Sequence, residues 1–416
     1  MTVSPRPPLK ALDDALQLLL GHAQALQALE SVPTGEADGR VLAQDVVSGL
    51  HVPPQDNSSM DGYALRCAEA QDLGLEFAVS QRIAAGTSGV ALQPGTVARI
   101  FTGAPVPPGA DAVVMQEDCT PLPDFDAAGL PRVRVNTMPL PGQWIRRAGE
   151  DVAQGDVVLA KGQRLGPAEL GLAASVGLAQ LLVVRRPRVA LFSTGDELVM
   201  PGTVAPQDMQ PGAIYNSNRF FLSALLRRLG CEVTDLGIVP DRREATVQAL
   251  RDAAQAHDVI LTSGGVSVGE EDHIKPAVQA LGALDLWQIA IKPGKPFAHG
   301  RIGAAHFLGL PGNPVSSLVT FWVLVRPFLL RLQGVTDVAM KTVASRADFD
   351  WPRADKRQEF LRVRRNTAGG LDLFPNQSSG VLTSAVWGDG MVDNPANTSI
   401  VYGDTVRYVS FSELLA

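Results

Sequence analysis

The chain has few of the features that mark secreted, disulfide-rich or membrane proteins. Its three cysteines, Cys67, Cys119 and Cys231, are far apart and form no Cys-x-x-Cys pair, which excludes a disulfide framework and a cysteine-based zinc site. The polar N-terminus predicts no secretory signal. The most apolar run, residues 315–330, is interrupted by an arginine and a proline and is shorter than the roughly 20 residues that cross a bilayer. We therefore expect a cytoplasmic protein with no membrane contact, in which this run forms a buried helix.

An excess of positive charge is also missing. The chain has 36 Lys and Arg against 43 Asp and Glu, a net charge of −7 with no sustained basic stripe, which excludes a dedicated nucleic-acid binder. Glycine and proline are abundant, at 40 and 30 of 416 residues, and indicate many tight turns and structured loops. At this length we expect two to four domains.

The hydrophobic pattern of the first half predicts two helices around a β-rich insertion. Leucines at i, i+4, i+7 and i+8 within residues 12–20 predict an amphipathic helix. Residues 166–178, with proline at the first helical position, predict a second helix that packs with the first. Between them, short β-rich pieces alternate with glycine and proline turns. We predict a helical linking and dimerisation domain of residues 1–48 and 146–184, interrupted by a β lobe of residues 49–145.

The second half alternates strands and helices and then becomes β-rich. Continuous apolar strands such as residues 259–261, each followed by a helix of 10 to 15 residues, predict a mostly parallel sheet with helices on both faces. We assign this three-layer α/β domain to residues 185–333 and a C-terminal β domain to residues 334–416. The fold class is thus multidomain α/β. In such sheets the ligand binds at the carboxyl ends of the strands.

Two loops in the α/β part are suited to hold anions. Gly264–Gly265 follow a buried strand and lead to a helix that starts near Asp272, and glycines let backbone amides approach a phosphate closely. Asn313 and Pro314 predict a helix start that leaves the amides of residues 315–317 free. Taken alone, each loop also fits an ordinary helix start, and Asp272 fits an N-cap as well as a Mg²⁺ ligand. Two such loops on one sheet favour a ligand with more than one oxyanion.

Charged side chains follow the same strands. Glu197 and Asp241 come after two other strands, so with Asp272 three strands end in carboxylates, the groups that Mg²⁺ binds together with phosphate oxygens. Lys292 and Lys295 flank a Pro-Gly turn, which fits both rigid positioning toward an anion and an ordinary solvated turn. The six histidines show no metal-ligand spacing, and we find no Ser-His-Asp set.

Nine motifs, in order along nearly the whole chain, resemble the molybdopterin molybdenumtransferase family. They are PPQDNSSMDGYA, RIFTGAPVP, DAVVMQED, IRRAGEDV, FSTGDEL, SNRFFL, TSGGVSVGEEDH, IKPGKPFA and GLPGNPVSS. The resemblance to this family, the MoeA family, whose mammalian relative is the C-terminal domain of gephyrin, implies an elongated homodimer of four-part subunits with an adenylyltransferase-like sheet domain. The implied reaction converts adenylyl-molybdopterin and molybdate into molybdenum cofactor and AMP, with Mg²⁺.

The family motifs also suggest roles for individual residues. The predicted catalytic residues are Asp61, Thr102, Asp151, Glu197, Asp241, Asp272, Lys292 and Lys295. The predicted substrate-binding residues are Ser263, Gly264, Gly265, Pro311, Gly312, Asn313, Pro314, Ser316, Arg362 and Ser379. Of these, Asp272, Glu197 and Asp241 are expected to hold Mg²⁺. Asp61 and Thr102 of the lobe and Asp151 of the linking domain are expected to serve a partner subunit's site. Arg362 and Ser379 are expected to lie near molybdate.

The resemblance also implies partners and leaves alternatives open. A separate molybdopterin adenylyltransferase is expected to supply the substrate, and cofactor-accepting proteins to collect the product. The adenylyltransferase itself is a rival interpretation, but that protein is far shorter. A non-catalytic scaffold of the gephyrin type is the other, and the presence of Asp272, Lys292 and Lys295 speaks against it. The choice between molybdate and tungstate stays open.

Overall fold

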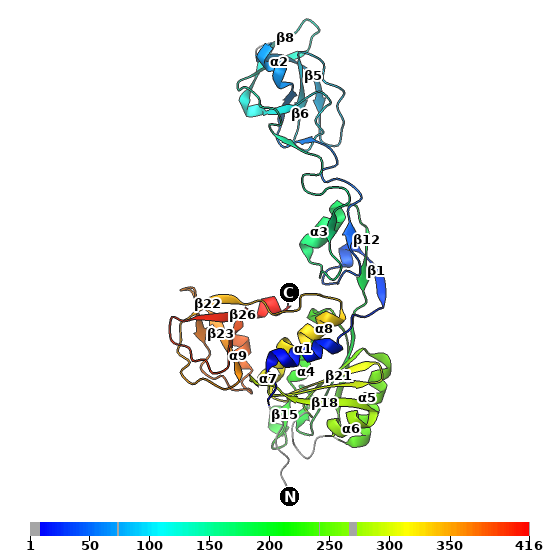
Figure 1. Ribbon diagram of the computed structural model, residues 1–416, viewed down its shortest axis with the longest axis vertical. Helices are drawn as coiled ribbons and strands as arrows, with labels where there is room; N and C mark the ends of the chain where they lie inside the picture. Colours follow the sequence, from blue (N-terminus) through cyan, green and yellow to red (C-terminus); the bar gives the residue numbers. More distant parts are fainter. Residues whose placement is uncertain (1–8, 73–74, 241, 266–272, 416) are drawn as a thin grey trace.

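The computed structural model describes residues 9–72, 75–240, 242–265 and 273–415 and shows an elongated molecule (Figure 1). A β lobe lies at one end, and a slender linking region of paired strands joins it to an α/β region at the other end. The C-terminal β region lies beside the α/β region (Figure 1). The multidomain α/β fold class is confirmed, while the exact domain boundaries stay a prediction.

The α/β region is built on a six-stranded sheet in the order β16-β13-β17-β21-β20-β18. Its first four strands are parallel, and the last two are antiparallel to their neighbours. The strands are β13 (Arg188–Thr194), β16 (Glu232–Val239), β17 (Val259–Ser263), β18 (Gly282–Gln288), β20 (Pro296–Ile302) and β21 (Ala305–Leu310). Every residue of β17 and β21 is buried, so the centre of the sheet is covered on both faces, as its apolar strands predicted.

Helices cover both faces of this sheet and give the predicted three layers. One face is covered by α5 (Arg243–Ala256) and α6 (Ile274–Leu281), which pack on strand residues such as Phe192. The other face is covered by α4 (Asn218–Arg228), α7 (Pro314–Thr320), the π-helical turn η4 (Phe321–Val325) and α8 (Arg326–Leu332). A small parallel pair, β14 (Leu198–Val199) and β15 (Ile214–Tyr215), follows β13.

The N-terminal helix α1 (Leu12–His22) forms as predicted but packs elsewhere. Its buried residues Leu12, Ala15 and Leu19 belong to the core of the α/β region, where α1 contacts α8 and η4. The prediction that α1 packs with the second helix is therefore wrong. The amphipathic period shows which face of a helix is buried but carries no information on the surface that covers it.

One helical run in the described part of the chain is long and apolar enough to cross a membrane, and it is a core element. Pro314–Leu332 spans 19 residues, more than the sequence pattern indicated, because Arg326 and Pro327 lie inside it instead of ending it. The π-helical turn just before Pro327 accommodates the residue that lacks an N–H. Nearly the whole run is buried, so the prediction of a buried helix is confirmed.

The linking region contains more strand than helix. Its pairs are β1 (Leu29–Pro33) with β12 (Gln180–Val184), β2 (Val46–Val47) with β11 (Val157–Leu159), and β3 (Asn57–Ser58) with β10 (Ile145–Arg146). Its helical elements are the turn η1 (Thr34–Glu36) and α3 (Pro167–Ser175), which begins at the predicted proline after Gly166. The description of this part as helical thus holds for α3 but not for α1.

The lobe and the C-terminal region each contain a six-stranded sheet. In the lobe the order is β7-β4-β6-β5-β9-β8. Its elements are β4 (Gly62–Leu65), α2 (Cys67–Asp72), β5 (Glu76–Ile83), β6 (Thr96–Ile100), β7 (Ala112–Met115), η2 (Gln116–Asp118), β8 (Cys119–Phe125) and β9 (Pro131–Val135).

In the C-terminal region a β23–β25 pairing closes five strands into a barrel, to which β19 adds from the α/β region. The elements are β19 (Ile291–Lys292), β22 (Val343–Ala347), β23 (Gln358–Arg365), β24 (Gly370–Leu373), α9 (Thr383–Trp387), β25 (Gly390–Asn394), β26 (Thr405–Ser410) and α10 (Phe411–Leu415).

Candidate functional site

The carboxyl ends of the parallel strands β13, β17 and β21 open into a cavity of about 750 Å³. This is the edge at which open α/β sheets bind ligands. The structure brings nine of the predicted site residues to its wall. They are Glu197, Ser263, Gly264, Gly265, Pro311, Gly312, Asn313, Pro314 and Ser316. We call this cavity the cleft.

The first anion-binding loop is shaped by glycine. After β17 ends at Ser263, Gly264 and Gly265 have φ values of +92° and +68°, which favour glycine. The Gly264 amide donates a hydrogen bond of 3.0 Å to the Leu310 carbonyl at the end of β21. A Cβ at Gly265 would lie 2.5 Å from Cγ1 of Ile274. The loop therefore requires glycine both for its conformation and for the close approach of α6.

In the second loop, more backbone amides already have hydrogen-bond partners than the sequence predicted. Asn313 is the N-cap of α7 and Pro314 its first residue, as expected. However, the Val315 amide donates to the Ser379 carbonyl at 2.9 Å, and the Ser317 amide donates to the Asn313 carbonyl at 2.9 Å. The prediction of three free amides is therefore wrong. In the described residues only the Ser316 amide of the three keeps no backbone partner, because the C-terminal region supplies a carbonyl that local sequence could not reveal.

Two asparagines that sequence reasoning missed also form the wall of the cleft. Asn218, at the start of α4, donates from Nδ2 to Ser263 Oγ and to the Gly312 carbonyl, both at 2.7 Å. It therefore ties the two anion-binding loops together. Asn216 lines the cleft as well and is only 2% exposed. Asn218 belongs to the SNRFFL family motif, which could have marked it as a site residue. The sequence pattern assigned it only to a helix.

The two lysines lie beside the cleft. Lys292 Nζ donates to the Glu359 carboxylate at 3.0 Å and lies 3.4 Å from Asp355. Glu359 is only 1% exposed and also accepts a bond of 2.7 Å from Trp351 Nε1. Lys292 thus joins the α/β region to the C-terminal barrel, where it pairs with Glu359 in the β19–β23 register. Lys295 neighbours Pro296, which lines the cleft.

The C-terminal candidates are close to the second loop. The Ser379 carbonyl bonds to α7, and its neighbour Gly380 lines the cleft. Arg362 is 1% exposed and donates to Ser384 Oγ at 3.1 Å and to the Phe360 carbonyl at 2.8 Å. Burial lowers the pKa of the Arg362 guanidinium to about 10. The structure places Ser379 at the rim of the cleft and Arg362 in the wall of the barrel behind it.

Three further candidates are not on the α/β region, and two of them, Asp61 and Thr102, belong to the lobe at the other end of the molecule (Figure 1). Asp61 accepts two hydrogen bonds of 2.8 Å, from the amide and from the hydroxyl of Thr102. The Thr102 amide, and then its hydroxyl, lower the pKa of the Asp61 carboxyl. Asp151 is exposed in the connection between lobe and linking region. Within one chain the structure therefore does not bring these three residues to the cleft.

The predicted metal ligands are only partly described. Asp241 and Asp272 lie outside the described residues, while Glu197 is exposed at the wall of the cleft. Among the residues that the structure describes, no group of three histidine, cysteine or carboxylate side chains is arranged to hold a metal ion. The exposed oxygens of Glu197 suit a hard cation such as Mg²⁺.

Family profiles match nearly the whole chain. The profile described as MoeA N-terminal region (domain I and II) matches residues 10–177, the profile described as probable molybdopterin binding domain matches residues 190–331, and the profile described as MoeA C-terminal region (domain IV) matches residues 344–411. Together they follow the order of the regions in the structure.

Relatives of known sequence and structure agree with these profiles. The chain is 44% identical over 324 residues to the molybdopterin molybdenumtransferase of Haemophilus influenzae, covering 78% of each chain. It is 37% identical over 388 residues to molybdopterin molybdenumtransferase 2 of Mycobacterium tuberculosis, covering 90% of this chain and 93% of that one. The crystal structure of a molybdopterin biosynthesis MoeA protein from Pyrococcus horikoshii is similar with a TM-score of 0.83 at 27% identity, covering 97% of this chain and all of that one. The chain therefore belongs to the MoeA family, the molybdopterin molybdenumtransferases of molybdenum cofactor biosynthesis.

Proposed function

We propose that the chain inserts molybdate into adenylyl-molybdopterin in the cleft and releases AMP, giving molybdenum cofactor. The observation that carries this proposal is the pair of anion-binding loops at neighbouring strand ends, joined by Asn218. The substrate contains a phosphoanhydride and molybdate is a dianion, so two loops on one sheet fit a reaction that brings several oxyanions together. Cleavage of the anhydride needs positioning and charge stabilisation more than a covalent nucleophile.

The cations beside the cleft have distinct roles in this proposal. In the part of the chain that the structure describes, no carboxylate lies within ion-pair distance of the Lys295 ammonium, which leaves it available to an anion. Lys292 is held by Glu359, and Arg362 by the barrel wall. Ser379 would meet the ligand at the rim of the cleft. These roles agree with the positive charge that molybdate and phosphates require at close range.

We also propose that Mg²⁺ assists the reaction. Glu197 would hold it together with Asp241 and Asp272, since all three follow parallel strands of the same sheet in the sequence and Glu197 lines the cleft. The bound ion would offset phosphate charge. Replacement of Asp272 with asparagine should leave folding intact and abolish Mg²⁺-dependent turnover, measured as AMP release over a Mg²⁺ titration. Retained turnover would move the metal to other ligands.

We propose further that the chain acts as a homodimer with shared sites. Asp61 and Thr102 are bonded to each other on the lobe, far from the cleft of their own chain (Figure 1). They can therefore act on a substrate only in the cleft of a second copy, and a two-fold dimer would supply two equivalent sites. We place this reaction in the cytoplasm, with a separate molybdopterin adenylyltransferase as supplier and cofactor-accepting proteins as recipients.

The central experiment measures AMP release from adenylyl-molybdopterin by the purified protein. The four conditions are with and without molybdate, each with Mg²⁺ present or chelated. The proposal requires release that depends on both ions. A protein that binds the substrate but releases no AMP under any condition would instead be a non-catalytic scaffold of the gephyrin type. The same assay with tungstate decides which oxyanion is preferred.

A complementation experiment tests the shared site. Asp61→Asn disables the lobe and Lys295→Ala disables the cleft, so homodimers of either variant should be inactive. In a mixed dimer one cleft is intact and faces an intact lobe, and about half of the wild-type activity per dimer should return. If the mixture stays inactive, each chain uses its own lobe or the two residues have no joint role.

A further inference from the structure

One face of the lobe sheet carries two arginines in direct contact with aromatic rings. Arg99 on β6 lies opposite Tyr63 on β4 and opposite Arg82 on β5 in the strand register. The guanidinium carbons of Arg82 and Arg99 lie 4.5 and 4.7 Å from the ring centroid of Phe101, and that of Arg99 lies 5.2 Å from the ring centroid of Tyr63. We call these four residues the arginine patch.

The arginines of the patch have no close ion-pair partner within the described lobe, although the Asp61 carboxylate interacts with Arg99 at longer range. In the described residues, neither Arg82 nor Arg99 forms an ion pair with a carboxylate. Arg99 donates to the Gly62 carbonyl at 3.0 Å and to the side-chain oxygen of Gln116, both uncharged. Like charges directly opposite each other on neighbouring strands destabilise a sheet. The contact with Phe101 supports both cations, and Asp61 compensates the charge of Arg99 only in part.

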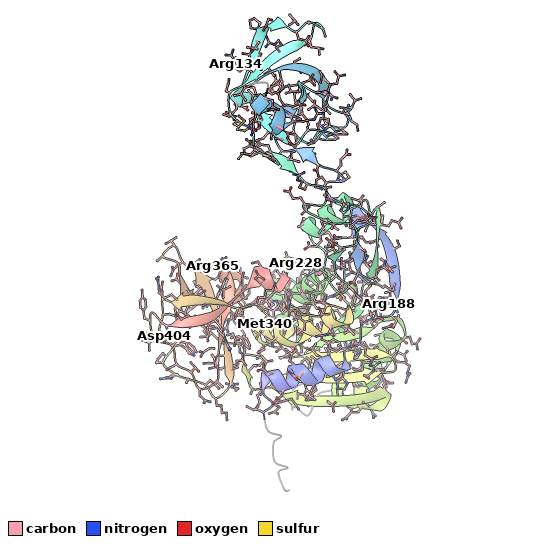
Figure 2. All side chains as sticks on the ribbon, turned by 45° about the horizontal axis from the view of Figure 1, so that its top comes forward. Arg134, Arg188, Arg228, Met340, Arg365 and Asp404 are labelled. Carbon is pink, nitrogen blue, oxygen red and sulfur yellow. The ribbon has the colours of Figure 1, made fainter. Side chains whose placement is uncertain are left out.

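Arginines elsewhere on the same sheet are paired. On β9, Arg132 and Arg134 form ion pairs of 2.8 and 2.5 Å with Glu76, and Arg132 also pairs with Asp124. Figure 2 shows Arg134 on the lobe. The lobe sheet thus neutralises its arginines at one edge and leaves two unpaired on β5 and β6. Two arginines without a close ion-pair partner are suited to bind an anion.

The patch is continuous with the lobe's candidate site residues. Thr102 directly follows Phe101, and its amide and hydroxyl hold Asp61. Asp61 in turn precedes Gly62, whose carbonyl accepts the bond from Arg99. A ligand that reaches Asp61 therefore also comes near the Arg99 guanidinium, which interacts electrostatically with the Asp61 carboxylate.

We propose that the arginine patch binds a tetrahedral oxyanion of the reaction, a phosphate group of adenylyl-molybdopterin or molybdate, held in the cleft of the neighbouring subunit. This inference rests on the proposed function and names Arg82 and Arg99 as additional substrate-binding residues. The planar guanidinium forms two parallel hydrogen bonds to such an anion. The contacts with Phe101 and Tyr63 hold the two guanidinium groups in place. The Arg82 side chain forms no hydrogen bond within the described residues, and Arg99 keeps for the ligand the N–H groups that Gly62 and Gln116 do not use.

The test uses the full-length protein with Arg82→Gln, Arg99→Gln and the double variant. Loss of either arginine should raise the KM for the substrate whose oxyanion the patch binds about tenfold in the AMP-release assay. The reason is that a charge-assisted hydrogen bond to the ground-state anion is removed. The kcat should stay within about threefold of wild type, since bonds lost equally from ground and transition states change KM alone. Arg134→Gln, which breaks an ion pair on the same sheet, is the matched control and should change neither constant.

The two possible ligands are distinguished by varying one substrate at a time. A rise in the KM for adenylyl-molybdopterin alone identifies a phosphate, and a rise in the KM for molybdate alone identifies molybdate. Arg82→Lys and Arg99→Lys keep the charge but lose the planar fork, so they should restore part of the affinity. Unchanged KM values for both substrates in the folded double variant, with wild-type turnover intact, would overturn the patch proposal and leave the proposed function standing.

A binding measurement separates the two proposals if the wild type shows no turnover. Calorimetric titration with AMP and with molybdate compares the wild type with the double variant and with Arg134→Gln. Weaker binding of one probe by the double variant alone supports the patch even where the proposed reaction has failed. Equal binding of both probes by all three proteins overturns it.

Discussion

The cleft and the arginine patch, which we both propose to bind anions, are built in opposite ways. In the cleft the geometry comes from the backbone, through Gly264, Gly265 and the start of α7, and Asn218 bonds these loops to each other. In the patch it comes from the side chains of Arg82 and Arg99 on regular strands. The difference teaches that the first surface cannot change without a change in the fold, whereas the second can change by single substitutions. Substitutions in the two surfaces should therefore differ in their effect on the stability of the fold.

The strongest test places a side chain at Gly265. Valine there would put Cβ 2.5 Å from Cγ1 of Ile274 at a φ of +68°, so both crowding and backbone strain should destabilise the fold. We expect a loss of about 3–4 kcal/mol in the free energy of unfolding, measured in urea, together with loss of AMP release. Gly303 has a φ of +59° but open space around its Cβ position, so Gly303→Val should cost only the strain. Equal losses in both variants would show that crowding is unimportant at Gly265.

Breaking the Lys292–Glu359 pair should also destabilise the fold. Lys292→Met leaves the Glu359 carboxylate buried with Trp351 as its remaining partner, so we expect a loss of about 3 kcal/mol in unfolding free energy. Glu359→Gln in the same chain should recover part of that loss, because no buried charge then remains. A double-mutant cycle in urea measures the coupling, and additive effects would contradict the pairing.

Lowering the pH should reduce the stability of the α/β region before that of the lobe. Burial lowers the pKa of His299 to about 4 and that of His306 to about 3 on strands β20 and β21. In the unfolded chain both titrate near 6.5, so the unfolded state binds more protons and stability falls as the pH drops from about 6.5 toward 4. We expect each histidine to cost about 2 kcal/mol at pH 4.5, measured by urea unfolding. His299→Phe, among the rings of Trp287 and Phe328, should flatten this pH dependence, and an unchanged slope would assign it to other groups.

The smallest effect on stability is expected in the patch itself. Replacing Arg82 and Arg99 with glutamine removes two like charges that face each other across strands, so the midpoint of unfolding should stay constant or rise slightly. Thermal and urea unfolding of the double variant provide the measurement. A marked loss of stability would show that the patch belongs to the core of the lobe and would remove the contrast with the cleft.

Sequence patterns gave the parts of the cleft that depend on local chemistry. The glycines after β17 and the Asn313–Pro314 helix start were predictable because φ preferences and capping act over a few residues. The partners of α1, the Ser379 carbonyl on Val315 and the role of Asn218 were not predictable. Each depends on a contact between segments far apart in the chain, and a hydrophobic period identifies a buried face without its partner. The arginine patch was missed for the same reason, since Arg82 and Arg99 meet only through the β5–β6 register.

The paired strands between lobe and linking region have a consequence for protein engineering. The segment that leads into the lobe and the segment that leaves it are paired at two places. Val46 lies opposite Leu159, and Asn57 lies opposite Arg146. A lobe can therefore be exchanged between relatives as a cassette with two neighbouring junctions, while the connectivity of the α/β region stays the same. Chimeras of this kind would transplant one half of the proposed shared active site and leave the other half untouched.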